Sequence, residues 1–195
     1  MLYCKKQLLK DIAQIKAGYA LRSKVPVDPE GTLFIVQMKD VNSDSGIDWS
    51  GLTRMNPVSL REPDYLKHGD VIFCGRGTRI FAVPVTINPE KAVAASQFFV
   101  LTPTDNAISA SYLSWYINSK PAQRYFWTNA AGSSIINVTR IVLENLPVLI
   151  PSPKDMITAA NLIKAINREK ELALQLCGRR QQLLETIISE GLEER

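Results

Sequence analysis

Hydrophobic and polar positions change their period along the chain near residue 150. Before it, short apolar runs alternate with glycine, proline, asparagine and aspartate, which is typical of strands joined by turns. The runs predict strands at 32–38, 71–74, 79–85, 96–101 and 145–150. Apolar residues at helical spacing predict helices over 8–15, over 108–118 and from Pro121 onward. The fold class indicated is α+β, with a strand-rich globular domain over 1–150.

The segment 151–195 predicts one long helix. Pro151-Ser152-Pro153 should form an extended hinge, and no proline follows between residues 154 and 190. Two adjoining heptad phases carry apolar residues, namely Leu162, Leu176 and Leu183 in one and Ile166, Ala173 and Ile187 in the other. Glu169 and Arg180 interrupt this stripe. At ~1.5 Å per residue the helix spans about 55 Å, too long to lie wholly against a domain of roughly 150 residues.

Part of the stripe therefore needs a partner helix, and we expect a coiled-coil homodimer. In an antiparallel pair, Glu169 and Arg180 can face each other and satisfy charges that are costly to bury singly. The alternative is a helix packed on its own domain, and the charged interruptions are compatible with both arrangements.

The predicted strands 71–74 and 79–85 are close enough to form a hairpin. Gly75 and Gly77 permit the backbone conformations of a tight connection. Arg76 and Arg79 would then lie at or beside the tip of this hairpin. Elsewhere, Trp115 is expected in the core, and His68 in a solvated turn.

Composition and charge refine this picture. The chain has 195 residues, 46% of them hydrophobic and 22% charged, with a net charge of +4. Residues 154–195 contain equal numbers of basic and acidic residues, so the whole +4 belongs to 1–153. The three cysteines do not indicate a disulfide framework, and no run approaches the ~20 apolar residues of a membrane helix. We expect a cytoplasmic protein.

The usual catalytic signatures are absent from the sequence. No phosphate-binding glycine loop, dinucleotide fingerprint or nucleophile elbow can be written, and there is one histidine. Asp40, Asp44 and Asp48 lack the glycine and terminal glutamate of a calcium loop, so we expect them to be solvated. The sequence predicts a binding protein without catalytic residues, metal or cofactor.

The order of several motifs resembles the DNA specificity (S) subunits of type I restriction-modification systems. The resemblance runs through residues 9–19, 37–41, 65–73 with its Gly69-Asp70, the Arg76-Gly77-Thr78 turn, 111–113 with 117–119, 132–135 and 146–151. His68 stands where the family often has proline, and the helix start lacks the family's acidic-Gln pair. Family members usually carry two target-recognition domains and two conserved helices, whereas this chain has one of each. It resembles a half-length form.

The resemblance implies a non-catalytic protein that reads one half of a split target in double-stranded DNA. Its helix would set the spacing between the halves and dock the modification (methyltransferase) subunits, while a motor-nuclease subunit completes the complex. A twofold pair predicts an inverted-repeat target with half-sites roughly one to two duplex turns apart. The alternative is a helix-mediated scaffold or regulatory protein of the same fold that does not bind DNA.

Candidate DNA contacts lie on predicted loops of the first domain. Arginine suits guanine edges and phosphates, so Arg76 and Arg79 on the hairpin are candidates for contacts to bases or to phosphates. The further candidates, as backbone contacts or hydrogen-bond donors to phosphate, are Lys39, Arg54, Arg22, Lys24, Ser133 and Ser134. Each of these can equally be a solvated surface residue. The helix stripe supplies the candidate dimer and subunit interface, formed by Leu162, Ile166, Ala173, Leu176, Leu183 and Ile187.

Overall fold

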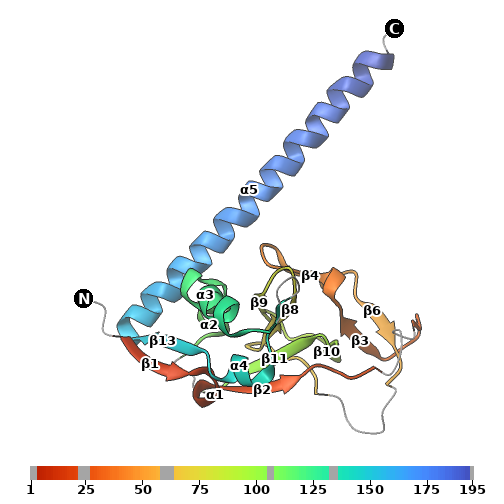
Figure 1. Cartoon of the computed structure of the whole chain (residues 1–195). Coiled ribbons are helices and arrows are strands. Elements are labelled where there is room, and N and C mark those ends of the chain that lie inside the picture. The colour runs from red at the N-terminus through yellow and green to blue at the C-terminus, as the bar shows by residue number, and fades with distance from the viewer. Residues whose placement is uncertain (1–3, 22–26, 58–63, 105–107, 132–135, 194–195) are drawn as a thin grey trace.

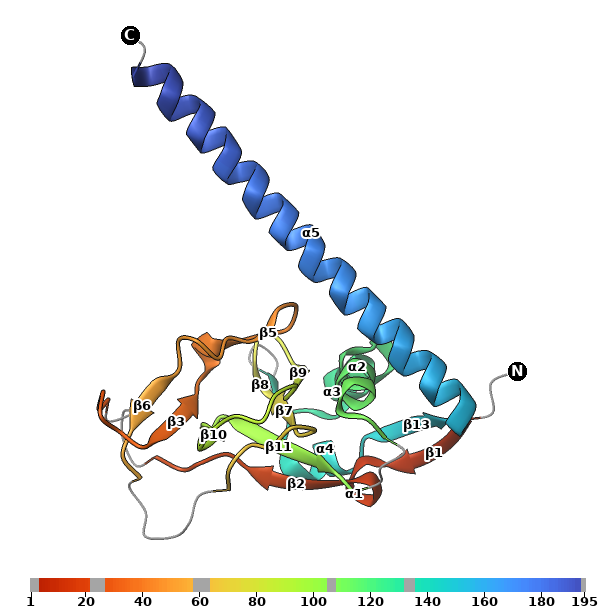
Figure 2. The same cartoon turned by 180° about the vertical axis from the view of Figure 1, so that it is seen from behind.

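The computed structural model describes residues 4–21, 27–57, 64–104, 108–131 and 136–193. A strand-rich domain carries a long helix that projects away from it (Figures 1 and 2). The predicted α+β class is confirmed. The helices are α1 (Leu9–Ile12), η1 (Met38–Asp40), α2 (Ala110–Asn118), α3 (Lys120–Asn129), α4 (Arg140–Glu144) and α5 (Pro153–Glu193). The strands are β1 (Cys4–Leu8), β2 (Ala13–Ala17), β3 (Leu33–Val36), β4 (Val41–Asn42), β5 (Gly46–Ile47), β6 (Thr53–Met55), β7 (Val71–Cys74), β8 (Arg76–Gly77), β9 (Phe81–Pro84), β10 (Ala92–Ala94), β11 (Phe98–Pro103), β12 (Ile136–Asn137) and β13 (Pro147–Pro151).

A four-stranded antiparallel sheet with the order β2-β11-β7-β9 occupies the centre of the domain. Strand β7 is buried at every position because alternate side chains enter two different cores. Val71 and Phe73 join the core that contains α2, α3 and α4. Ile72 and Cys74 join the core formed with the three-stranded sheet β10-β3-β6. The central sheet therefore holds two lobes together.

The long helix starts on the first of these cores and then leaves it. Met156 and Ile163 are buried among the residues of the α2–α4 core. The Ser152 side chain accepts a hydrogen bond from the Asp155 N–H at 3.3 Å, and its hydroxyl donates to Asp155 Oδ2 at 2.7 Å, so Ser152 begins the helix. Pro151 ends strand β13, which pairs with β1. The expected extended hinge is in fact a strand end followed directly by a helical turn.

Two other predictions about local structure are wrong. The expected helix over 8–15 is a single turn, α1, between strands β1 and β2, because these strands pair with β13 and β11. Trp115 is 47% exposed rather than buried. It lies on the outer side of α2, whose other face supplies Tyr112, Leu113, Tyr116 and Ile117 to the core. Its Tyr112 ring contact, at 5.8 Å between centroids, holds it on the surface.

In the described part of the chain, no helix has an apolar stretch long enough to cross a bilayer. Within the same residues, no group of three or more His, Cys, Asp or Glu side chains gathers in a way that could hold a metal ion.

Candidate functional site

Arg76 lies on a short strand rather than at the open tip of a hairpin. Strands β7 and β9 pair as predicted. The residues that join them in the sequence include β8, which pairs with β12 and sets Arg76 opposite Asn137. Gly77 has φ +124°, a backbone conformation that favours glycine. A Cβ on Gly75 would come 2.7 Å from the Phe73 ring, so this position also requires glycine. Arg76 and Arg79 are both exposed. The two glycines that flank Arg76 fix the backbone conformation at this residue.

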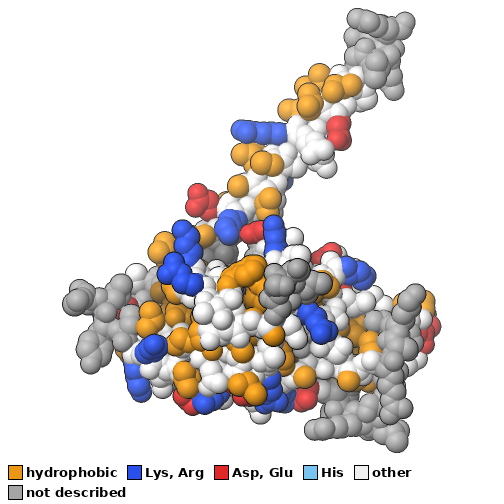
Figure 3. All heavy atoms as spheres, viewed as in Figure 1, with side chains coloured by type: hydrophobic (Ala, Val, Ile, Leu, Met, Phe, Trp, Pro, Cys, Tyr) orange, Lys and Arg blue, Asp and Glu red, His pale blue; other side chains and the backbone are white. Residues whose placement is uncertain are grey.

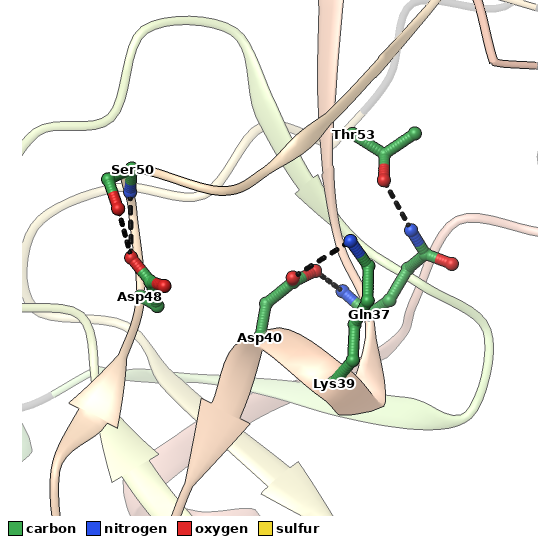
Figure 4. Close-up of polar contacts among 6 residues, drawn as sticks. All are labelled: Gln37, Lys39, Asp40, Asp48, Ser50 and Thr53. Carbon is green, nitrogen blue, oxygen red and sulfur yellow. Dashed lines mark hydrogen bonds and ion pairs between the residues drawn. The ribbon is translucent and has the colours of Figure 1, made fainter.

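Lys39 belongs to the turn η1, which several hydrogen bonds hold in place (Figure 4). The Gln37 N–H donates to Asp40 Oδ2 at 2.9 Å, and Lys39 Nζ lies 3.4 Å from Asp40 Oδ1. The Gln37 side-chain amide donates to Thr53 Oγ1 at 2.8 Å and ties the turn to β6. Asp40 is only 6% exposed, so the expectation that it is solvated is wrong. Its burial is possible because the turn satisfies its carboxylate.

The same turn brings Lys39 toward the strand that carries Arg76. Met38 Sδ lies 3.8 Å from Cys74 Sγ, so η1 contacts the end of β7 two residues before Arg76. Burial raises the pKa of the Cys74 thiol, which keeps it protonated as a packing group. The structure thus places two candidate DNA contacts, Lys39 and Arg76, on neighbouring segments.

Asp48 accepts hydrogen bonds within a different turn from the one that contains Asp40 (Figure 4). The Ser50 hydroxyl and N–H donate to Asp48 Oδ1 at 2.6 and 3.0 Å, and the hydroxyl bond chiefly lowers the pKa of this carboxyl group. Asp44 is exposed and lies 3.8 Å from Lys170 Nζ of the long helix. The three aspartates therefore act in separate contacts rather than as one ligand set.

Arg54 is engaged in contacts within its own lobe. Its guanidinium lies 4.9 Å from the centre of the Phe34 ring and donates to the Pro29 carbonyl at 3.4 Å. It belongs to β6, which lies at the far edge of the domain from β8 (Figures 1 and 2). The structure does not bring Arg54 together with Arg76. The remaining candidates, Arg22, Lys24, Ser133 and Ser134, lie outside the described residues.

Two motifs that carry the resemblance have structural roles. Asp70 is buried, and its carboxylate accepts hydrogen bonds from the Lys67 N–H at 2.8 Å and the Thr102 hydroxyl at 2.7 Å. Gly69 precedes it with φ +94°. On α2, the Asn118 side chain accepts from the Ala82 N–H at 2.8 Å and donates to the Ala82 carbonyl at 2.7 Å. These hydrogen bonds position β7, β9 and α2.

Helix α3 presents basic and aromatic side chains that the sequence analysis did not select. Lys120, Arg124 and Trp127 occupy one outer face at the spacing i, i+4 and i+7, and all three are exposed. A signal for them exists in the sequence, because residues 106–143 contain no aspartate or glutamate. The excess of basic over acidic residues in this segment becomes clear only when charges are counted over short segments rather than over the whole domain.

The apolar stripe of α5 lies on a different face from the one that packs against the domain. The buried or half-buried contacts to the domain are Met156, Ala159 and Ile163. The residues of the predicted interface, Leu162, Ile166, Ala173, Leu176, Leu183 and Ile187, are all exposed. At 100° per residue the two faces are about 100° apart. A helix covered by its own domain therefore does not describe the chain beyond Ile163.

Comparison with known proteins supports the fold. No family model matches the sequence, and a search of curated proteins finds no match. Among solved structures, the HsdS subunit from Thermoanaerobacter tengcongensis superposes with a TM-score of 0.64 at 14% identity, covering 94% of this chain and 47% of that chain. The type I restriction-modification S subunit from M. genitalium gives 0.56 at 15% identity, covering 86% and 40%.

A third chain, from a structure on complex assembly and conformational transition of the type I R-M system, gives 0.55 at 13% identity, covering 87% and 41%. The chain thus spans less than half the length of each of these three solved structures. At these identities the likeness shows a shared fold, a strand-rich domain with a long helix.

Proposed function

We propose that the chain is a sequence-specific DNA-recognition subunit of a type I restriction-modification complex. It would be non-catalytic, cytoplasmic, and responsible for one half of a bipartite target. The observation that carries this proposal is the combination of an S-subunit-like fold with a long helix whose apolar stripe is exposed. An exposed apolar stripe of this length indicates a surface that a partner helix covers.

The apolar stripe of α5 is complementary to the stripe of a second α5 when the two helices pair in one antiparallel register. When Glu169 faces the partner's Arg180, the same alignment sets Leu162 opposite Ile187, Ile166 opposite Leu183, and Ala173 opposite Leu176. Every apolar position meets an apolar one, and both charged positions meet the opposite charge. This matching supports a homodimer with twofold symmetry, in which each helix covers the partner's stripe.

The helix length then gives a prediction about the DNA. Helix α5 has 41 residues, which at ~1.5 Å each is about 60 Å. In the antiparallel register the two domains lie near opposite ends of the pair. A duplex turn is ~34–36 Å, so the half-sites of an inverted repeat would lie roughly one to two turns apart.

Apolar residues outside the stripe support docking of further subunits. Leu172, Leu174, Leu184 and Ile188 are between 47% and 58% exposed and lie beside or behind the stripe. A two-helix pair covers only a narrow seam, so much of this surface stays exposed in the dimer. Helices of the modification subunits are the partners that we propose for it, with the motor-nuclease subunit completing the complex.

The proposed base reader is Arg76, which is exposed and held on β8, together with Arg79 close by. Lys39, beside the same strand end, is a proposed phosphate contact. Arg54 stays a weaker proposal because its guanidinium already contacts Phe34 and Pro29. The proposals for Arg22, Lys24, Ser133 and Ser134 rest on the sequence.

Selection of bound duplexes from a random pool by the full chain tests this function. The expected result is an inverted repeat with a spacer of unspecified sequence, bound with an affinity that falls steeply as salt rises. A single continuous motif without symmetry would contradict the twofold arrangement. Absence of salt-dependent DNA binding would favour the scaffold alternative, which uses the helix for protein assembly only.

A further inference from the structure

The outer face of α3 carries positive charge without acidic partners. Lys120 and Arg124 are exposed, and neither makes an ion pair within the residues that the structure describes. Trp127 continues the same face at 61% exposure, while Ala122 and Phe126 fill the core on the other side. A large exposed aromatic ring beside two unpaired cations gives this face the character of a contact surface.

The backbone that follows this helix pairs with the segment that lies next to Arg76. After α3 ends at Asn129, Ala131 forms a bridge to Asn137, whose N–H donates to the Ala131 carbonyl at 3.0 Å. Asn137 in turn is paired with Arg76 across β12 and β8. Both side chains are exposed. We name this surface the α3–β8 strip, formed by Lys120, Arg124, Trp127, Asn137 and Arg76.

Local charge favours a polyanion as the partner of the strip. Residues 106–143 contain no acidic residue, and the third basic residue in this segment, Arg140, is paired with Glu144 at 2.7 Å. Lys120 and Arg124 lie about 6 Å apart along the helix axis, close to the ~7 Å that two phosphate steps of one strand cover along a duplex. Basic and apolar side chains lie side by side over the region of α2 and α3 (Figure 3).

We propose that the α3–β8 strip is a DNA-contact surface in which Lys120 and Arg124 bind phosphates of the duplex backbone. Trp127 contacts the sugar edge of the same strand, and the paired strands β8 and β12 direct Arg76 and Asn137 toward the bases. The inference rests on the proposed DNA-recognition function and assigns it a surface that includes α3. Phosphate contacts on a helix fixed to the core would set the orientation in which Arg76 meets the groove.

The test compares two double variants of the full chain. Lys120→Ala with Arg124→Ala removes the strip cations, and Lys67→Ala with Lys91→Ala is the matched control. The control lysines are exposed and lie on neighbouring segments of the other lobe, because the Leu66 N–H donates to the Ala92 carbonyl at 2.8 Å. Affinity for a random-sequence duplex pool is measured over a salt series, and circular dichroism confirms that each variant folds.

Loss of two phosphate contacts should reduce the salt slope by about 1.8 per protomer and weaken binding roughly 60-fold at ~0.1 M salt. Trp127→Ala should weaken binding with an unchanged slope, because no charge is removed. The control should bind as the wild type does. Equal losses in both double variants would indicate a general charge effect and overturn the inference.

Wild-type-like DNA binding by the strip variant would also overturn the inference while leaving the proposed function intact. If this variant instead lost capture of a purified modification subunit, the strip would be a protein-docking surface. A wild-type chain without salt-dependent DNA binding would overturn the proposed function and this inference together. The wild-type measurement therefore separates the two failures.

Discussion

A charge exchange on α5 tests the antiparallel register directly. Glu169→Arg would place a new arginine opposite the partner's Arg180, at two symmetry-related places in the dimer. Arg180→Glu would place two glutamates opposite each other in the same way. Each single variant should therefore dimerise poorly with itself. Mixed together, the two variants restore both opposite-charge pairs and should form a heterodimer.

The expected magnitude follows from the exposure of these positions. Both residues lie on the exposed part of the helix, where an ion pair contributes about 0.5 kcal/mol. Each single variant replaces this attraction with a repulsion of similar size at two places in the dimer. The free energy of dimerisation therefore becomes less favourable by about 2 kcal/mol. That corresponds to roughly 30-fold in the dimer dissociation constant. The double variant, with both charges exchanged, should recover the wild-type value.

Sedimentation equilibrium at low salt measures these constants. The control is Glu185→Arg, which makes the same charge change on the opposite side of the helix, where Glu185 accepts only a 3.3 Å bond from Gln181. The register is refuted if Glu169→Arg dimerises like the control, or if the mixture shows no preference for the heterodimer. A parallel pair would give the first of these results, because position 169 would then face its own copy and Glu169→Arg would replace one like-charge contact with another.

Three further outcomes are expected. Leu176→Glu should place a charge in the centre of the seam and reduce the dimer to monomer in light scattering, while the domain keeps its melting temperature because Met156 and Ile163 are untouched. Arg76→Ala should weaken binding to the selected site by ~1–3 kcal/mol and relax specificity at one base pair, measured by competition against mutated duplexes. Asp70→Ala leaves the Lys67 N–H and Thr102 hydroxyl unpaired, and should lower the free energy of unfolding by about 2–4 kcal/mol in urea titrations.

Several elements were predictable because their signals are local. Helix α2 begins where Ser109 accepts the Tyr112 N–H, and Pro121 lies in the first turn of α3. The pairing of β7 with β9 followed from two apolar runs around glycines. The 41-residue helix was predicted from its heptad pattern and its lack of proline.

Other elements depend on contacts between distant parts of the chain. Segment 8–15 has a helical pattern, but its flanks pair as strands with β13 and β11, whose residues lie roughly 80 to 150 positions away. Strand β10 pairs in parallel with β3, an arrangement that no turn signal announces. Trp115 shows that an apolar pattern at helical spacing does not identify which of its residues stays exposed to solvent.

The candidate site divides in the same way. Arg76 was selected because its glycine neighbours mark a special backbone, which the structure confirms at Gly77. Arg54 was selected on charge alone, and the Phe34 ring that holds its guanidinium becomes a neighbour only through strand pairing. The face of α3 is harder to predict because its side chains lie several residues apart, and the backbone after the helix reaches the neighbour of Arg76 only through strand pairing.

The anchoring of α5 in the domain core makes the helix a lever. Its first turns are fixed by Met156 and Ile163, while its free arm is exposed from Lys164 through Ser189. A tilt of about 5° at the base would displace the tip of a ~60 Å rod by roughly 5 Å, more than the rise of one base pair. Substitutions at those two anchor residues would therefore retune the distance between the two recognition domains of the proposed dimer.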